Sequence, residues 1–271
     1  MKYATLELLC CPTCQSTLRF GNEPESGIID DGRLLCTQCE RSYPIHNEIV
    51  HFIEPQELER PNSHFARYYD RLAPFYSVFT KLAFLPFGGE RKAREEILDR
   101  LNFNGGRTLE VSIGNGINLP YFFESPNIGE IYGLDISLGQ LSGCKRLLNK
   151  KGWQVDLFLG VAEALPFKPN TFDNVLHIGG INFFSDKKQA IDEMIRVARP
   201  GSKIVIADEA ERLAKRVNKS IDISSPGQGI GEIETTIINL VPKTMKEIRA
   251  EGIWKAHSKH HGYCLEFIKP T

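Results

Sequence analysis

The ten residues 107–116, RTLEVSIGNG, constrain the fold of this chain more than any other stretch. An apolar run of β type ends in a loop spaced Ser112-x-Gly114-x-Gly116, and a second apolar run closes on Asp135. Glycine lets backbone approach a ligand closely, because it has no Cβ and tolerates positive φ. A carboxylate at the end of the next strand can accept hydrogen bonds from ribose hydroxyls. Together the two features predict a site for a nucleoside-containing cofactor.

The spacing of the small residues narrows the class of cofactor. A dinucleotide-binding loop beginning at Gly114 would need glycine at the position of Leu119, and no Gly-Lys-Ser/Thr follows. The pattern Glu110-x-Ser112-x-Gly114-x-Gly116 instead resembles motif I of class I S-adenosylmethionine-dependent methyltransferases. Ser112 stands where that family has its first glycine, and we expect its backbone to lie in an ordinary β or bridge region.

Later segments resemble the successive motifs of the same superfamily. They are residues 160–167, 170–173, 196–201 and 203–208. The pattern Tyr69-Asp70-x-x-Ala73-x-x-Tyr76 is similar to the helix that precedes motif I in the ubiquinone/menaquinone C-methyltransferases. The resemblance covers roughly residues 65–271. It implies a Rossmann-like, doubly wound sheet of seven strands, with S-adenosylmethionine as methyl donor.

Site residues follow from the resemblance, position by position. The implied cofactor-binding residues are Tyr69, Tyr76, Glu110, Ser112, Gly114, Gly116, Asp135, Ile136, Ala162, Glu163 and His177. The family usually has Asp where Val161 stands, and that Asp binds the adenine amino group. We expect the backbone of Ala162 and the carboxylate of Glu163 to serve the ring edge instead.

Two Cys-x-x-Cys pairs mark a separate N-terminal module. They are Cys11/Cys14 and Cys36/Cys39, and thiolates at this spacing can hold one zinc ion tetrahedrally. A redox role for the pairs is the alternative. The adjacent Cys10 is expected to be a buried structural thiol. The module resembles the small zinc-ribbon activator of tRNA, rRNA and release-factor methyltransferases, here fused in cis. The resemblance implies an intramolecular contact between the ribbon and the methyltransferase domain.

Composition bears on whether the protein binds nucleic acid and on the cellular compartment in which it resides. The 271 residues carry a formal net charge of −1 with a pI near 6.7, which gives no global electrostatic footprint for nucleic acid. We expect a cytoplasmic protein, because no stretch has the length and apolarity of a signal peptide or a membrane span. Five of the seven cysteines crowd into the first 39 residues, unlike a disulfide framework.

Segments with strand-like and with helix-like apolar patterns alternate along the rest of the chain, and they predict its domains and strands. We expect a zinc ribbon over 1–55, a linker over 56–64 and the methyltransferase domain over 65–271. Parallel strands are predicted at 108–112, 130–135, 155–159, 174–178 and 203–207. A final antiparallel hairpin over 245–254 and 263–268 is joined by a polar loop with His257, His260 and His261. The segment 65–79 is expected to cap the cofactor pocket, and 221–240 to lie over the substrate opening.

Three functions compete at this point. The first is a methyltransferase for a small acceptor, with a pocket built from Phe75, Tyr76, Phe79, Phe183 and Phe184. The second is an RNA or protein methyltransferase whose ribbon presents the substrate. The third is a non-catalytic cofactor-binding module. Methyl transfer needs alignment above all, and a general base only if the acceptor loses a proton. Weak candidates for that base are His177, Asp208 and Tyr76.

Overall fold

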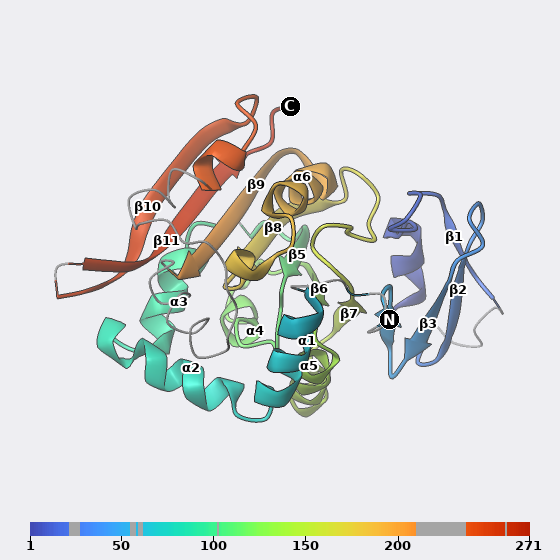
Figure 1. Cartoon of the computed structure of the whole chain (residues 1–271), viewed down its shortest axis with the longest axis horizontal. Coiled ribbons are helices and arrows are strands. Elements are labelled where there is room, and N and C mark those ends of the chain that lie inside the picture. Colours follow the sequence, from blue (N-terminus) through green and yellow to red (C-terminus); the bar gives the residue numbers. More distant parts are fainter. Residues whose placement is uncertain (22–27, 55–57, 59–61, 102, 210–236, 258) are drawn as a thin grey trace.

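The computed structural model describes residues 1–21, 28–54, 58, 62–101, 103–209, 237–257 and 259–271. These residues form one sheet of eleven strands in the order β1-β2-β3-β4-β7-β6-β5-β8-β9-β11-β10 (Figure 1). The strands are β1 Leu18–Phe20, β2 Gly32–Cys36, β3 Ser42–His46, β4 Ile49–His51, β5 Arg107–Val111, β6 Glu130–Asp135, β7 Val155–Leu159, β8 Phe172–Ile178, β9 Ala198–Glu209, β10 Lys246–Ala256 and β11 Lys259–Ile268.

The seven strands from β5 to β11 form the predicted doubly wound sheet. Parallel pairing joins β7, β6, β5, β8 and β9, and the hairpin of β10 and β11 completes the sheet with antiparallel pairing to β9. The fold class inferred from the motifs is therefore confirmed. Several strand boundaries differ, and two of them shift by four residues or more. β9 begins at Ala198 instead of position 203, and the hairpin turn is tight enough to place His260 and His261 on β11.

Helices cover the sheet and line its carboxyl edge. They are η1 Tyr3–Leu8, α1 Asn62–Leu72, α2 Tyr76–Phe84, η3 Leu85–Phe87, α3 Glu90–Leu98, α4 Leu119–Phe122, α5 Leu138–Lys151, η4 Ile181–Phe183 and α6 Lys187–Val197. Ser137 caps α5, because its hydroxyl accepts a hydrogen bond from Gln140 N at 3.1 Å. α1 begins inside the segment expected to be a linker.

The ribbon strands continue the large sheet. β4 pairs in parallel with β7, Ile49 opposite Leu157, and Phe52 N donates to Leu159 O at 2.8 Å. Without β4, strand β7 would be the open edge of the large domain, a row of unpaired backbone groups. Figure 1 shows the ribbon at one end of the molecule and the β10–β11 hairpin at the other. The ribbon therefore belongs to the same sheet, which the sequence pattern did not predict.

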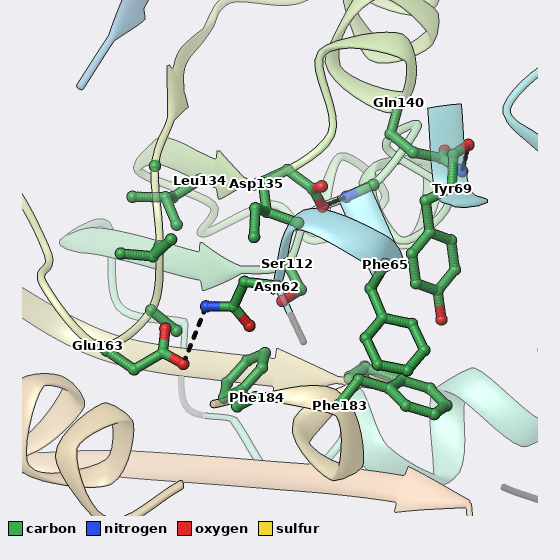
Figure 2. Close-up of a pocket in the computed structure, with 18 of the residues that line it drawn as sticks. Asn62, Phe65, Tyr69, Ser112, Leu134, Asp135, Gln140, Glu163, Phe183 and Phe184 are labelled. Atoms are coloured by element: carbon green, nitrogen blue, oxygen red, sulfur yellow. Dashed lines mark hydrogen bonds between the residues drawn. The ribbon is translucent and has the colours of Figure 1, made fainter. Parts of the chain in front are cut away.

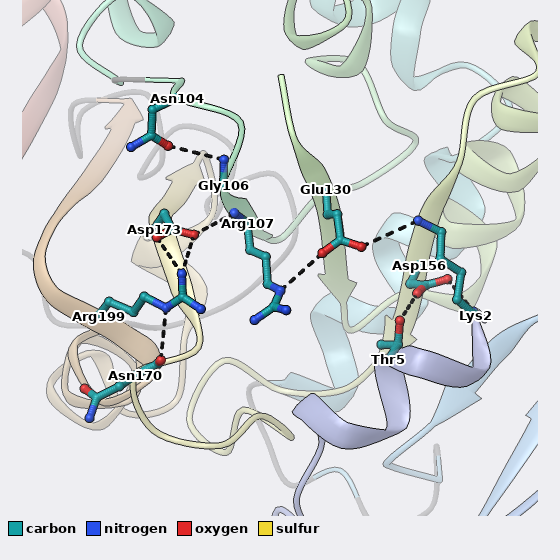
Figure 3. A network of polar contacts seen from close by, with 10 residues as sticks. All are labelled: Lys2, Thr5, Asn104, Gly106, Arg107, Glu130, Asp156, Asn170, Asp173 and Arg199. Atoms are coloured by element: carbon teal, nitrogen blue, oxygen red, sulfur yellow. Dashed lines mark hydrogen bonds and ion pairs between the residues drawn. The ribbon is translucent and has the colours of Figure 1, made fainter. Parts of the chain in front are cut away.

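Polar contacts reinforce this junction (Figure 3). The Asp156 carboxylate on β7 is almost buried and accepts hydrogen bonds from Lys2 N, at 3.0 Å, and from the Thr5 hydroxyl. Phe52 packs between Tyr43 of the ribbon and Phe158 of β7, with ring centroids 4.9 and 6.3 Å away. Apolar residues of both domains thus share one core.

Within the described ranges, no helix combines the length and the apolar character needed to cross a lipid bilayer.

Candidate functional site

A pocket that encloses about 690 Å³ of space, part of it open to solvent, lies at the carboxyl ends of the parallel strands, where a doubly wound sheet binds its ligands. We call it the cofactor cavity. Figure 2 shows its lining from β6, the loop after β7, the loop after β8 and helix α1. The residues lining it are Asn62, Phe65, Tyr69, Tyr76, Ser112, Gly114, Leu134, Asp135, Ile136, Gln140, Gly160, Val161, Ala162, Glu163, Ile178, Gly179, Gly180, Phe183 and Phe184. Eight of the eleven expected cofactor-binding residues are among them: Tyr69, Tyr76, Ser112, Gly114, Asp135, Ile136, Ala162 and Glu163.

Asp135 supplies a buried carboxylate to this cavity. Its Oδ2 accepts from Gly114 N at 2.8 Å and its Oδ1 from Ser137 N at 2.9 Å, which fixes the side chain between the glycine loop and the start of α5. Burial raises the pKa of this carboxyl to about 6. Each carboxylate oxygen keeps an acceptor position for a further donor, as the pair of ribose hydroxyls requires.

The glycine loop differs from the expectation in two ways. Ser112 has φ 64°, in the left-handed region and not in the β or bridge region that we expected. Such a conformation costs a non-glycine residue about 1–3 kcal/mol and persists where surrounding contacts impose it. Gly116, with φ 77°, is not among the lining residues; a Cβ there would meet Cys144 Sγ and Leu119 Cδ1 at 2.8 Å. Gly116 therefore allows close packing against α5, and Gly114 is the glycine that faces the cavity.

Glu110 lies behind the cavity, at the centre of a buried polar chain. Its Oε1 accepts from Asn118 Nδ2, while Asn118 Oδ1 accepts from Arg94 Nη1 at 2.5 Å. Complete burial raises the pKa of Glu110 to about 8, and Oε2 has no described partner. Asn118 and Arg94 line a neighbouring cavity, whereas Glu110 lines neither cavity and is bonded to that wall through Asn118.

Helix α1 forms the cover over the cofactor cavity. Asn62, Phe65 and Tyr69 follow helical spacing and point into it (Figure 2). Asp70 points the other way, and its Oδ1 accepts from the Ser137 hydroxyl and, at 2.8 Å, from Gly139 N. The Tyr-Asp motif therefore places a tyrosine in the cavity and uses the aspartate to fasten α1 to α5.

The expected adenine end is lined by apolar side chains. Val161 and Ala162 line it together with Leu134. Glu163 is already occupied, because its Oε1 accepts from Asn62 Nδ2 at 3.3 Å and from Ser185 N at 2.9 Å. Glu163 thus ties α1 to the loop after β8, and this leaves fewer acceptor positions for an adenine amino group than we expected.

Gln140 was missed as a site residue. The sequence predicted no role for it in the site, yet its side chain lines the cavity. Its Nε2 donates to Tyr69 O at 3.4 Å, and its Oε1 is buried without a described partner. An orphaned acceptor in a cavity wall fits a ligand that brings a donor, such as a hydroxyl or an ammonium group.

His177 is displaced from its expected role. It is completely buried in β8, with Nδ1 3.0 Å from Val111 O and its ring against Phe184, and it is not among the residues lining either cavity. Burial lowers its pKa to about 4. It is therefore a neutral core residue, without access to a ligand as cofactor contact or base.

A second pocket, which encloses about 910 Å³ of space including part open to solvent, shares Tyr69, Tyr76, Ser112 and Gly114 with the first. It extends toward α2, α3 and the β10–β11 hairpin. Its own lining is Thr80, Ala83, Phe84, Phe87, Arg94, Ile113, Ile117, Asn118, Asp208, Glu209, Trp254 and His261, besides the shared Ile178, Gly179 and Gly180. We call it the acceptor cavity.

The aromatic lining differs from the one we expected. Phe75 and Phe79 are exposed on the outer side of α2, and Phe183 and Phe184 line the cofactor cavity. Phe84, Phe87 and Trp254 take their place, the Phe84 and Trp254 ring centroids being 5.0 Å apart. The expected cover over 221–240 lies almost entirely outside the described residues.

The acids of the acceptor cavity have separate roles. The Asp208 carboxylate accepts from the backbone N of Gly180, Asn182 and Glu209, at 3.2, 3.1 and 2.8 Å. It organises the loop after β8. Glu209 forms no such bonds with described residues; burial and the neighbouring Asp208 raise its pKa to about 7. Tyr76, whose pKa burial raises to about 12, keeps its proton at neutral pH and cannot act as a base.

The four expected zinc ligands converge within the N-terminal ribbon. The Sγ atoms of Cys11, Cys14, Cys36 and Cys39 lie within 4.8 Å of one another, with nearest pairs at 3.6 and 3.4 Å. Tetrahedral Zn–S bonds of about 2.3 Å require S···S distances of about 3.8 Å. The donor set therefore fits zinc. Cys10 lies outside this cluster; its backbone N donates to Pro166 O at 3.0 Å, and burial raises the pKa of its thiol to about 11.

Comparisons with known proteins agree with this architecture. A family model described as "Methyltransferase domain" matches residues 109–206, and one described as "Trm112p-like protein" matches residues 2–48. A demethylmenaquinone methyltransferase of Renibacterium salmoninarum is 32% identical over 152 residues, 56% of this chain and 61% of that protein. A ubiquinone/menaquinone biosynthesis C-methyltransferase of Geobacter sulfurreducens is 31% identical over 54% of this chain and 59% of its own length. The chain spans about three fifths of the length of these relatives.

Solved structures share the fold at low sequence identity. A complex of the Haloferax volcanii Trm112 methyltransferase activator with a putative methyltransferase aligns with a TM-score of 0.58 and 14% identity, over 75% of this chain and 98% of that one. Phosphoethanolamine N-methyltransferase 2 of Haemonchus contortus, in complex with S-adenosyl-L-methionine, aligns at 0.55 and 16%, over 75% and 60%. The expected cofactor classes, S-adenosylmethionine and structural zinc, agree with these matches. One segment of the chain is thus similar to a methyltransferase-domain family and another to the Trm112p-like family, in the order that its two sets of motifs indicated.

Proposed function

We propose that this chain is an S-adenosylmethionine-dependent methyltransferase that acts on a small, largely apolar aromatic acceptor of the quinol type. The observation that carries the proposal is the pair of adjoining cavities. One holds the buried Asp135 carboxylate, and the other is walled by Phe84, Phe87 and Trp254. The two meet at Tyr69, Tyr76 and Gly114, which is where a methyl group would have to pass.

Residues of the cofactor cavity fit the donor molecule. Asp135 would accept the ribose hydroxyls, Gln140 Oε1 would take a further donor, and Val161 with Leu134 would face the adenine ring. S-adenosylmethionine supplies the electrophilic methyl carbon. The cavity walls hold the acceptor in line with that carbon, which is the main requirement of such a displacement.

Glu209 is our candidate for the base. Methylation of an aromatic carbon breaks the bond between sulfur and the methyl carbon, forms a C–C bond and releases one proton from the acceptor. A half-buried carboxylate that lines the acceptor cavity, with a pKa of about 7, can accept that proton at neutral pH. Asp208 is less suited, because three backbone N–H groups already occupy it.

The position of the ribbon favours a stabilising role over substrate presentation. β4 pairs with β7 on one side of the large domain, whereas Trp254 and His261 bring the β10–β11 hairpin, at the other end of the sheet, to the acceptor cavity. A substrate held by the ribbon would have to reach across the parallel strands. We therefore infer that the ribbon acts as an activator fused in cis.

The experiment is methyl transfer from labelled S-adenosylmethionine by the full chain. Separate reactions contain a chemically reduced demethylmenaquinol, total RNA, total protein and a lipid-soluble extract. We expect label in the quinol and in the lipid-soluble extract. Label confined to RNA or protein would refute the small-molecule acceptor. Absence of transfer, with intact binding of S-adenosylhomocysteine by calorimetry, would favour a non-catalytic module.

A further inference from the structure

The outer face of α2 and η3 exposes a cluster of large apolar side chains. Eight large hydrophobic residues are exposed among the described ones, and five of these fall within eleven consecutive positions. They are Phe75, Val78, Phe79, Leu82 and Leu85, each 56 to 65% exposed. We call this set the α2 patch. Single exposed apolar residues are common on protein surfaces, but a contiguous cluster marks a surface that another body covers.

The patch is one stripe of a helix with two apolar sides. Its members occupy positions i, i+3, i+4, i+7 and i+10 counted from Phe75, which places them on one face at 100° per residue. Tyr76, Thr80 and Phe84 lie on the opposite side and line the acceptor cavity. The helix is therefore the wall between that cavity and whatever covers the patch.

The segment that carries the patch has only basic charged side chains, and the two acids that bound it, Asp70 and Glu90, are already bonded to Ser137 and Arg94. From Arg71 to Gly89 the sequence contains two charged residues, Arg71 and Lys81, both positive and both exposed. Lys92 adds a third, because its side chain lies against Gly88 just beyond η3. An apolar stripe flanked by basic residues is characteristic of helices that lie in the interface of a membrane with anionic lipids.

A second copy of the chain fits this surface less well. A two-fold contact brings the same patch together from both molecules. Lys81 would then approach its own copy, and the stretch from Arg71 to Gly89 offers no acid to pair with it. Anionic headgroups supply the complementary charge instead.

We propose that the α2 patch docks this protein on an anionic lipid surface, so that an apolar acceptor reaches the acceptor cavity from the bilayer along α2. The idea that docking serves acceptor delivery rests on the proposed function. The docking itself rests on the exposed stripe and its basic flanks.

Vesicle flotation of the full, zinc-loaded chain tests the docking. We expect the protein to float with vesicles of phosphatidylcholine and phosphatidylglycerol, more weakly with pure phosphatidylcholine, and less as salt is raised. Phe79→Ser combined with Leu82→Ser should weaken binding at least about tenfold, since it removes two apolar anchors from the buried face. Ile28→Ser is the matched control, because Ile28 is an exposed apolar residue of the ribbon.

Further measurements distinguish a loss of membrane docking from misfolding and from a loss of methyl transfer. Neither Phe79 nor Leu82 lines a cavity, so the double variant should bind S-adenosylhomocysteine as the unmodified chain does. Docking is overturned if the chain stays with the unbound protein for both vesicle types, or if the double variant floats unchanged. A dimer that the double variant abolishes, without flotation, would assign the patch to a second copy. Flotation that depends on the patch, in a protein without methyl transfer to the quinol, would leave docking standing and remove the proposed function.

Discussion

Breaking the hydrogen bonds of Asp156 should loosen both domains together. This carboxylate on β7 accepts from Lys2 N at 3.0 Å and from the buried Thr5 hydroxyl, both in the ribbon (Figure 3). Hydrogen bonds to a charged group contribute about 1.5–3 kcal/mol each. Asp156→Ala removes both bonds and leaves the Thr5 hydroxyl without its partner, so we expect a loss of about 3–5 kcal/mol in the free energy of unfolding.

A double-mutant cycle isolates the contact between the domains. Thr5→Val keeps the shape of the side chain and removes its hydroxyl. The single and double variants together should give a coupling energy of about 1–2 kcal/mol between Thr5 and Asp156. Glu130→Gln is the matched control, because its ion pair with Lys2 is exposed at 3.8 Å and such pairs contribute at most about 1 kcal/mol.

The assay follows each domain by its own probe during urea unfolding. Both tryptophans, Trp153 and Trp254, lie in the large domain, so their fluorescence reports that domain alone. Release of zinc to a colorimetric chelator reports the ribbon. We expect coincident midpoints in the unmodified chain and a joint shift in Asp156→Ala. A coupling energy near zero, or a fluorescence midpoint that Asp156→Ala leaves in place, would refute the reasoning.

The other predictions concern the two sites. Asp135→Ala should weaken S-adenosylhomocysteine binding roughly ten- to a hundredfold by calorimetry, because it removes charge-assisted hydrogen bonds; unchanged affinity would place the ribose elsewhere. Val161→Asp should tighten binding by restoring an acceptor for the adenine amino group, and weaker binding would contradict this. Cys11→Ser should lose zinc in elemental analysis while Cys10→Ser retains it; the reverse result would reassign the first Cys-x-x-Cys pair. For quinol methylation, kcat/KM should rise with pH to about 7 and then level, since Glu209 accepts a proton only when ionised. Glu209→Gln should abolish this rise, and a profile unchanged by the substitution would exclude Glu209.

Local signals predicted most of the sheet. The strands 130–135 and 155–159 lie where their apolar runs placed them, because buried parallel strands read as short apolar stretches between turns. The pairing of β4 with β7 could not be predicted from apolar runs in the sequence. Ile49–His51 is three residues long, and its pattern is the same whether the strand ends a ribbon or continues another sheet. The partner of so short a strand is decided by tertiary contacts such as those of Asp156 and Phe52.

The cofactor cavity was easier to predict than the acceptor cavity for a physical reason. Asp135 and Gly114 belong to one turn and the strand beside it, so their relative position follows from local backbone geometry. Phe84 and Trp254 are 170 positions apart and meet only because the hairpin folds against η3 and α3. Helical periodicity alone could not decide which side of α2 would face inward, since apolar residues occupy both sides.

Ser112 belongs to the local glycine loop and also lines both cavities. Its sequence position suggested a tolerable replacement for glycine in an ordinary conformation, yet the chain holds it at φ 64°, where glycine is favoured. The residue lines both cavities, at the point where the cofactor and the acceptor would meet. Strain of this kind gathers at functional sites, where the surrounding contacts fix it. Under the proposed function, a serine here would place a hydroxyl at the junction of the two cavities, which a glycine cannot do.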